Sequence, residues 1–327
     1  MFPYLLALAL IFDFLNGFHD SSNIVATAIS SGSVRPRSAL VLAALAEFAG
    51  PFIFGVAVAT TIGEGLLDLS VVPVQAITAA LLAAVIWNII TWYIGIPSSS
   101  SHALIGGLLG SAVLAGGFGW IHPSGLIKIL AALLISPVLG LATGFLAMRF
   151  VLWAARDASP RINYLFRRLQ VGTLLTLALS HGTNDAQKTM GVIAMGLVAS
   201  GYLDTFHVPL WVIAASAGAI ALGTSLGGWR LIRTLGGKIM RVRPVDAFTS
   251  QVAGTAVILG AAIFGGPVST TQVMSSAIIG VGAAERITKV RWLILQDMVT
   301  AWLLTIPVTA AVSALAYLLL STVLPAA

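Results

Sequence analysis

Two related stretches decide how this chain folds: GFHDSSN at residues 17–23 and SHGTNDAQK at residues 180–188. Each places an aspartate, Asp20 or Asp185, in sequence that is otherwise apolar enough to cross a lipid bilayer. An amide or an ammonium side chain follows three residues after each aspartate. Because an ionised group inside a bilayer is costly, we interpret both aspartates as functional residues.

The composition around these stretches is that of a membrane protein. Of 327 residues, 58% are hydrophobic and 9% are charged, whereas soluble domains average about 25% charged residues. Apolar runs of roughly 20 residues recur along the chain, which is the length that a helix needs to cross the hydrocarbon core. The sequence therefore predicts an all-α polytopic membrane protein of the cell (cytoplasmic) membrane. The absence of cysteine excludes disulfides and thiolate metal sites.

About ten membrane segments are expected. The first, residues 1–31, and the sixth, residues 171–200, would each be a discontinuous helix, interrupted at the aspartate near Gly17 or Gly182, because glycine within a span loosens a helix. The remaining expected segments are residues 39–62, 73–95, 97–117, 126–148, 209–229, 247–264, 267–284 and 293–323.

The basic residues predict how these segments cross the bilayer. Fifteen of the 17 Lys and Arg residues lie in four links, at residues 32–38, 149–170, 230–244 and 285–292. The positive-inside rule places those links in the cytoplasm, so the first half begins outside and the second half begins inside. The sequence thus predicts two inverted-topology repeats, residues 1–150 and 171–327, joined by a basic cytoplasmic linker at 151–170. These positions argue against nucleic-acid binding, despite the net charge of +6.

A second motif is also duplicated. The runs PSSSSH at 97–102 and PVSTTQ at 267–272 follow the aspartate stretch in each half. Proline followed by hydroxyl residues is typical of a helix start, whose free backbone N–H groups bind anions. Two such starts that face each other would bind a tetrahedral oxyanion, although the hydroxyls could also simply cap a helix. The candidate substrate-binding residues in these runs are Ser99, Ser100, Ser101, Ser269, Thr270 and Thr271.

The aspartate stretches supply charge of both signs. Asp20 and Asp185 offer hard oxygen ligands for Na⁺ or a divalent metal, or sites for a proton. Asn23 offers hydrogen-bond donors and an acceptor, and Lys188 offers a positive charge to an anion. The alternative is a structural Asp–Lys ion pair within one span. With Glu47 included, the ionised groups sum to −2, so an anion would need accompanying cations, and we infer symport.

Other polar residues within the spans carry weaker signals. Glu47 could be a proton or cation site, or a protonated structural residue. Gln251 could be a cation ligand, although an interhelical hydrogen bond is the more common role for such a residue. The histidines beside the motifs, His19, His102 and His181, could titrate or orient a neighbour. The sequence contains no Walker or HExxH motif that would support an enzyme.

The two aspartate stretches and the element PVSTT at 267–271 resemble the duplicated signature of the inorganic phosphate transporter (PiT) family, over nearly the whole chain. This resemblance implies two inverted repeats with discontinuous helices, a homodimer, and a phosphate site flanked by cation sites. Carried over by position, Asp20, Asn23, Asp185 and the two hydroxyl runs would hold phosphate and its cations. The sequence departs from the family pattern at four positions, which are His19, Lys188, Gln251 and Gln272.

We therefore expect a symporter of inorganic phosphate that works by alternating access, without a cofactor or an enzymatic step. The coupling ion is Na⁺ or H⁺, and a divalent metal could be carried with the phosphate. A sulfate or other oxyanion permease is the alternative within the same class. An anion channel or a membrane scaffold without transport activity is the alternative from another class, and a channel for anions would more typically be lined by Arg or Lys.

Overall fold

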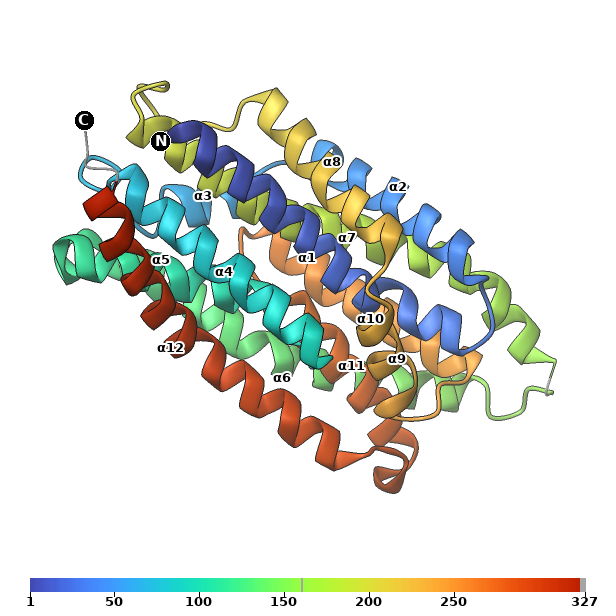
Figure 1. Cartoon of the computed structure of the whole chain (residues 1–327). Coiled ribbons are helices and arrows are strands. Elements are labelled where there is room, and N and C mark those ends of the chain that lie inside the picture. Colours follow the sequence, from blue (N-terminus) through green and yellow to red (C-terminus); the bar gives the residue numbers. More distant parts are fainter. Residues whose placement is uncertain (160, 324–327) are drawn as a thin grey trace.

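The computed structural model describes residues 1–159 and 161–323, which form a bundle of helices (Figure 1). The first half contains α1 (Phe2–Ser30), α2 (Pro36–Phe54), α3 (Ala57–Gly63), α4 (Val74–Ile94), α5 (Ser100–Gly116) and α6 (Pro123–Ala154). The second half contains α7 (Ile162–Ala199), α8 (Leu210–Leu226), α9 (Trp229–Arg233), α10 (Pro244–Ile263), α11 (Thr270–Glu285) and α12 (Trp292–Val323). Short 3-10 or π turns cover Phe118–Trp120, Thr234–Lys238 and Ile287–Lys289. Within the described residues, β pairing is limited to one bridge between Leu67 and Ile121.

The helices confirm the prediction of an all-α membrane protein. Among the described residues, six helices are long and apolar enough to cross a membrane: α1, α2, α4, α6, α10 and α12. A seventh span is added if α8 and the segment Trp229–Lys238 are counted together, although they meet at a bend of 60°. Helices α5 and α11 coincide with the two short segments that were expected to follow the Pro-Ser/Thr runs.

The prediction that the helices are interrupted at the aspartate stretches is wrong. Helix α1 passes Gly17 without a break, and α7 likewise passes Gly182. Both glycines instead allow another helix to come close. A Cβ at Gly17 would overlap the carbonyl oxygen of Ile220 in α8, and a Cβ at Gly182 would overlap that of Glu47 in α2.

The helix breaks occur elsewhere in the chain. Helices α2 and α3 are separated at Gly55, and α8 and α9 at Gly227; both glycines have a positive φ, of 81° and 73°. Gln187 of α7 satisfies the backbone at the first break. Its side-chain oxygen accepts a hydrogen bond from the Val58 N–H at 2.7 Å, and its amide nitrogen donates to the Gly55 carbonyl. A polar residue of the second aspartate stretch therefore stabilises an irregular segment that lipid could not solvate.

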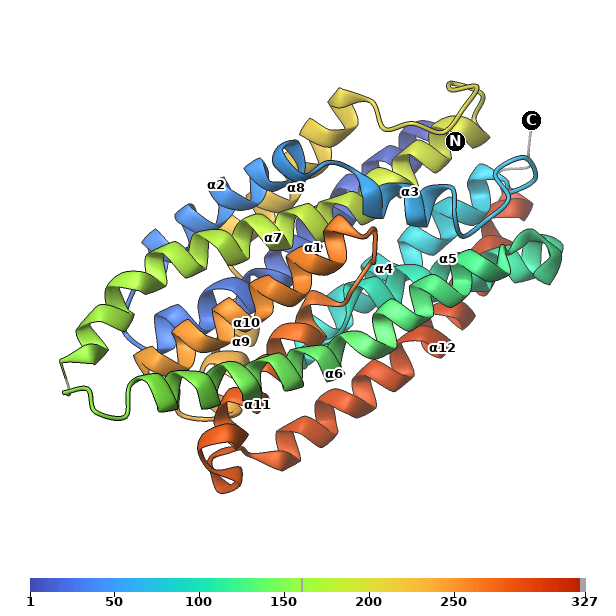
Figure 2. The ribbon, with the colours of Figure 1, turned by 180° about the vertical axis from the view of Figure 1, so that it is seen from behind.

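The two halves of the chain interdigitate. Helix α1 packs on α8 and α7 packs on α2, while α5 packs on α12 and α11 packs on α6 (Figures 1 and 2). Each contact is a close one between glycine and backbone. A Cβ at Gly110 of α5 would overlap the Ala310 carbonyl, and a Cβ at Gly280 of α11 would overlap the Leu141 carbonyl. The halves therefore form one body around a shared centre.

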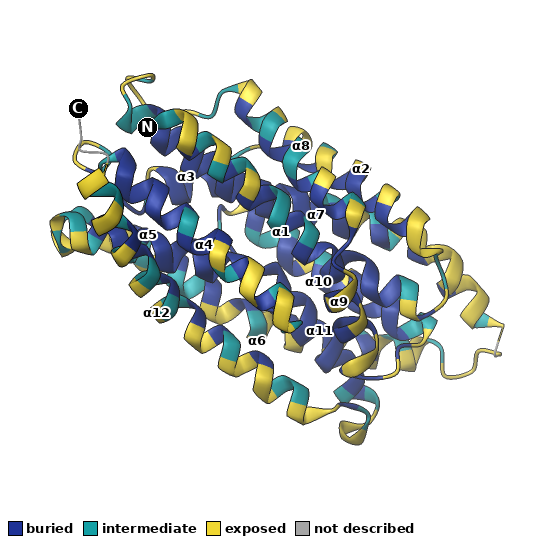
Figure 3. Cartoon of the chain, in the orientation of Figure 1, coloured by how far each residue is buried: buried dark blue, intermediate teal, exposed yellow. Residues whose placement is uncertain are grey.

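Burial follows the same plan. The central helices α1, α7, α10 and α11 are largely buried, whereas α6 and α12 expose apolar residues along their length (Figure 3).

The basic linker expected at 151–170 is shorter than predicted, because α6 continues to Ala154 and α7 begins at Ile162. The N-terminus and the C-terminal end of α12 lie at the same end of the bundle (Figure 1).

Candidate functional site

The middle of the bundle holds a buried cluster of polar side chains. Helix α1 contributes residues spaced three and four apart, which places them on one helical face. Helix α7 contributes a second polar face. The start of α11 contacts both α1 and α7, and the start of α5 contacts α7 through Ser101. The contributing residues of α1 are Asp13, Asn16, Asp20, Asn23 and Thr27, all buried.

The two aspartates are joined through one threonine. Thr270 lies at the first position of α11, and its hydroxyl is 2.9 Å from Oδ2 of Asp185 and 3.3 Å from Oδ2 of Asp20. Both aspartates are 0% exposed. Residues 165 positions apart in the chain are thus neighbours, as the matched motifs predicted.

His181 lies between the aspartates and Glu47. Its Nδ1 is 2.6 Å from Oε1 of Glu47, and the other carboxylate oxygen of Glu47 accepts a hydrogen bond from Thr224 of α8. Its Nε2 lies 3.2 Å from Oδ2 of Asp185 and 3.8 Å from Oδ2 of Asp20, within ion-pair distance but without hydrogen-bond geometry to either. Glu47, expected as a cation ligand, therefore reaches the aspartates through a histidine.

Both hydroxyl runs begin a helix, as predicted. The Ser99 hydroxyl caps α5 by accepting from the His102 N–H at 3.1 Å, and the Ser269 hydroxyl caps α11 by accepting from the Gln272 N–H at 3.3 Å. Ser101 of α5 donates to the Val268 carbonyl at 3.2 Å, so the two helix starts touch. The first N–H groups of an α-helix have no acceptor within that helix, so two sets of donors meet here.

Lys188 is held by oxygen atoms of three kinds. Its ammonium donates to the carboxylate of Asp185, to the hydroxyl of Ser101 at 2.6 Å and to the carbonyl of Val268 at 2.8 Å. An ammonium has three donors, and all three are used in these contacts. The side chain is 1% exposed. We refer to Asp185, Lys188 and Ser101 as the second half-site.

The matching residues of the first half form the first half-site: Asp20, Asn23 and Thr271. The Thr271 hydroxyl is 3.1 Å from Oδ1 of Asp20, and the Asn23 amide donates to that hydroxyl at 3.0 Å. The side-chain oxygen of Asn23 is buried and has no hydrogen-bond partner in the part of the chain that the structure describes. His19 adds a ring nitrogen, Nδ1, at 2.7 Å from Oδ1 of Asp20.

Two expected residues lie at the edge of this cluster and contact neither aspartate. The Gln251 oxygen accepts from Thr173, and its amide lies 3.3 Å from the Thr27 hydroxyl, so it joins three helices without touching either aspartate. The His102 ring contacts the hydroxyl of Ser99 at 2.6 Å and so supports the cap of α5.

Two residues of the cluster, Asp13 and Asn16, were not predicted from the sequence. Asp13 is fully buried and accepts from the Thr189 hydroxyl, and the Asn16 amide lies 3.5 Å from Oδ2 of Asp185. The signal that could have found them is their spacing, because they continue the helical face of Asp20 by seven and four residues. His181 was expected only beside the site, although its position four residues before Asp185 carries the same signal.

The centre of the cluster could hold a cation. One ligand atom each from Asp20, His181 and Asp185 lie within 4.8 Å of one another, and all three residues are buried. The carboxylate and hydroxyl oxygens around them are ligands for hard cations such as Na⁺ or Mg²⁺. The neighbouring helix starts are suited to an anion. The cluster therefore offers complementary places for ions of both signs.

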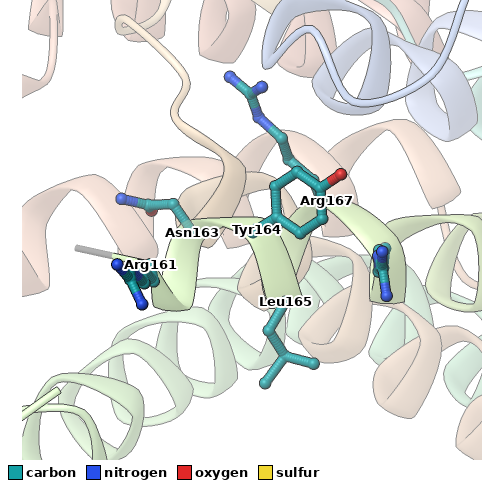
Figure 4. Close-up of a pocket in the computed structure, with 6 residues that line it drawn as sticks. Arg161, Asn163, Tyr164, Leu165 and Arg167 are labelled. Atoms are coloured by element: carbon teal, nitrogen blue, oxygen red, sulfur yellow. The ribbon is translucent and has the colours of Figure 1, made fainter. Parts of the chain in front are cut away.

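Three cavities that the described residues form outside this cluster contain no pair of aspartates. One of about 650 Å³ lies at the start of α7 and is lined by Arg161, Tyr164 and Arg167 (Figure 4). The Arg168 guanidinium lies 4.9 Å from the centre of the Tyr164 ring. With a rise of about 1.5 Å per residue, this cavity is about 25 Å along the helix from His181. A second cavity, of about 590 Å³, lies beside the α2–α3 break and includes Lys128, whose ammonium donates to Thr61 at 3.1 Å.

A third cavity, of about 580 Å³, lies at the cap of α10 and includes Arg243. Partial burial opposes the charge of Arg243, but its hydrogen bonds to Asp246 and Glu285 raise the pKa of the guanidinium above its ordinary value. This network ties the α10 cap to the end of α11, and it does not touch either aspartate of the cluster.

Comparison with known proteins places the chain among transporters. The model of a family described as "Phosphate transporter family" matches residues 16–313. The chain is 44% identical over 317 residues to a "Probable low-affinity inorganic phosphate transporter" of Bacillus subtilis, covering 96% of this chain and 95% of that protein. It is 45% identical over 315 residues to one of Rhizobium meliloti, covering 96% and 94%. A solved structure titled "The sodium-dependent phosphate transporter" superposes with a TM-score of 0.89 at 25% identity, over 99% of both chains.

Proposed function

Because this chain belongs to the phosphate transporter family, we propose that it carries inorganic phosphate across the cell membrane in symport with a cation, Na⁺ or H⁺. One observation carries the proposal. Both buried aspartates and both hydroxyl-capped helix starts meet in a single cluster, joined by Thr270. Phosphate would be bound by the first N–H groups of α5 and α11 and by their hydroxyls. Its cations would be bound by the carboxylates of Asp20 and Asp185.

The charge of the cluster supports coupling to a cation. Asp20, Asp185 and Glu47 carry negative charge when ionised, and Lys188 carries one positive charge. A phosphate dianion added to this net negative site would be repelled across a few ångströms of low dielectric. A cation that enters with the phosphate offsets this repulsion, so the empty site favours binding of both ions together over binding of the anion alone. A divalent metal bound to the phosphate would serve the same purpose.

The packing supports two inverted repeats, residues 1–150 and 171–327. Matched helices make matched contacts: the contact of α1 with α8 corresponds to the contact of α7 with α2, and both are made at a glycine. Under the positive-inside rule the basic ends face the cytoplasm, so each half enters the membrane from the opposite side. Such repeats favour alternating access, in which one group of helices rocks against the other around a fixed central site.

Uptake of radiolabelled phosphate into proteoliposomes tests the proposal. Na⁺ and pH gradients are varied independently, with and without Mg²⁺ in the medium. We expect saturable uptake driven by at least one gradient, and unlabelled phosphate should compete better than sulfate. The exposed residue Asp204 provides a matched control, because Asp204→Asn removes a carboxylate far from the cluster. Absence of saturable uptake under every gradient would contradict the proposal, and stronger competition by sulfate would reassign the substrate.

A further inference from the structure

The two half-sites differ in one respect that the proposed function does not explain. Their positions correspond: Asp20 and Asp185 match, the residues three positions later match, and Thr271 and Ser101 are both the second residue of a helix. At the second half-site the matched position is a lysine, whose ammonium is bound by three protein oxygens. At the first half-site it is Asn23, whose own oxygen is left without a partner among the described residues.

The oxygens around the Lys188 ammonium are those of a cation site. A carboxylate, a hydroxyl and a backbone carbonyl converge from three segments of the chain, and these are the ligand types that hard cations take. The ammonium uses all three donors on them, so no donor remains to point at an anion. The Lys188 ammonium is therefore placed as a bound cation would be, and it is not placed to bind an anionic substrate.

We propose that Lys188 is a tethered cation, which fills the cation position of the second half-site in place of a freely exchanging ion. A small monovalent cation is then taken up at the first half-site alone, where Asp20, Thr271 and the unpaired oxygen of Asn23 provide its ligands. This inference deepens the proposed function and rests on it for its transport consequences. The positions at which cations bind can be tested without a transport assay.

A tethered cation has a consequence that a freely exchanging one does not. The ammonium neutralises Asp185 during substrate binding and returns with the empty carrier, so it contributes no net charge to the cycle. A freely exchanging cation in the same place would be released with the phosphate. Replacing Lys188 by asparagine makes the second half-site chemically like the first and opens it to such an ion.

The substitutions form a matched set. Lys188→Asn removes the ammonium and supplies an amide oxygen. Lys188→Met removes the ammonium, fills a similar volume and supplies no oxygen ligand. Asn23→Lys adds an ammonium to the first half-site, beside Asp20. Together they separate loss of charge from gain of a cation site.

Thermal unfolding of the purified protein in detergent, in NaCl against choline chloride, tests the binding claim directly. A ligand that binds only the folded state raises the Tm with its concentration. We expect the Na⁺-specific rise in Tm to be larger in K188N than in the wild type, absent or reduced in N23K, and no larger in K188M than in the wild type. LiCl and KCl serve as further probes of cation size.

Two results would overturn the proposal. A folded K188N protein whose Tm responds to Li⁺, Na⁺ and K⁺ as the wild type does would show that no cation position has been opened. If K188N does not fold, N23K decides, because an undiminished Na⁺ response in N23K would rule out cation binding at the first half-site. If these binding results hold but no variant and no wild-type protein takes up phosphate, the proposed function fails and the cation assignment stands.

Discussion

The two half-sites share their backbone plan but not their charge. Each pairs an aspartate on a long helix with the hydroxyl of the second residue of a short helix from the other half of the chain. Asp20 contacts the Thr271 hydroxyl directly. Asp185 is connected to the Ser101 hydroxyl through the Lys188 ammonium. The first half-site offers an amide at the third position and the second offers an ammonium. The glycine contacts between helices are alike in the two halves. Under our proposal, the side chain three positions after each aspartate sets how many free cations the site takes up.

Removing either carboxylate should have the largest effect on transport. Asp20→Asn and Asp185→Asn each take away a charged oxygen ligand at the centre of the cluster, so we expect both to abolish phosphate uptake in proteoliposomes. Their equal loss would show that the two half-sites act together. Normal uptake by either variant, at wild-type protein levels, would remove that aspartate from the site.

The same two variants should differ in stability. Asp185→Asn leaves the Lys188 ammonium buried without its carboxylate, and breaking a buried pair costs about 3–5 kcal/mol. Asp20→Asn leaves no buried ammonium, and the loss of hydrogen bonds to a charged group costs about 1.5–3 kcal/mol. We expect the Tm of D185N in detergent to be lower than that of D20N.

The double variant D185N/K188M provides the control for this difference, because it removes both charges of the pair. It should recover most of the Tm lost in D185N without recovering uptake. Equal Tm values for D20N and D185N would mean that the ammonium does not depend on Asp185.

The glycine contacts should be alike in the two halves. Gly17→Ala and Gly182→Ala each place a methyl group against a backbone carbonyl of a neighbouring helix, and overpacking of this kind costs about 1–3 kcal/mol. We expect similar decreases in Tm for both. Gly172→Ala on α7 is the matched control, since nothing lies within 4 Å of its Cβ position, and it should leave the Tm unchanged or raise it. A decrease in only one of the pair would show that the two contacts are not equivalent.

The smallest effect is expected at Gln251, which touches neither aspartate. Interhelical hydrogen bonds in membrane proteins average about 0.6 kcal/mol, close to a threefold change in an equilibrium constant. Gln251→Leu should therefore change the phosphate KM and the uptake rate by less than about threefold. A loss of uptake as complete as in D20N would place this glutamine in the substrate site after all.

Much of this arrangement could be predicted from the sequence. The apolar runs located the helices, and the matched motifs were enough to assign Asp20, Asp185 and the two hydroxyl runs to one site. Serine after proline indicated the caps of α5 and α11, because the capping hydrogen bond is local. These features depend on composition, on short-range spacing and on duplication, all of which a single sequence shows.

Other features depend on contacts between distant residues. Gly17 and Gly182 were interpreted as helix breaks, because a glycine in a span signals either a break or a close helix contact, and only the neighbouring helix decides between them. Two hydrogen-bond acceptors of the Lys188 ammonium belong to distant residues, Ser101 and Val268, which lie 87 and 80 positions away in the chain. Its expected role as an anion ligand therefore could not be weighed against a role in a cation site. The position of Asp13, seven residues before Asp20 on the same helical face, is a signal that the sequence does contain.

The most direct test of the central claim is the charge moved with each phosphate. Currents on a solid-supported membrane, calibrated by radiolabelled phosphate uptake under the same gradients, give this ratio for the wild type and for K188N. If Lys188 is a tethered cation, K188N in Na⁺ medium should carry about one more positive charge per phosphate than the wild type, because the replacing ion is released with the substrate. An active K188N protein with the wild-type ratio would contradict the account.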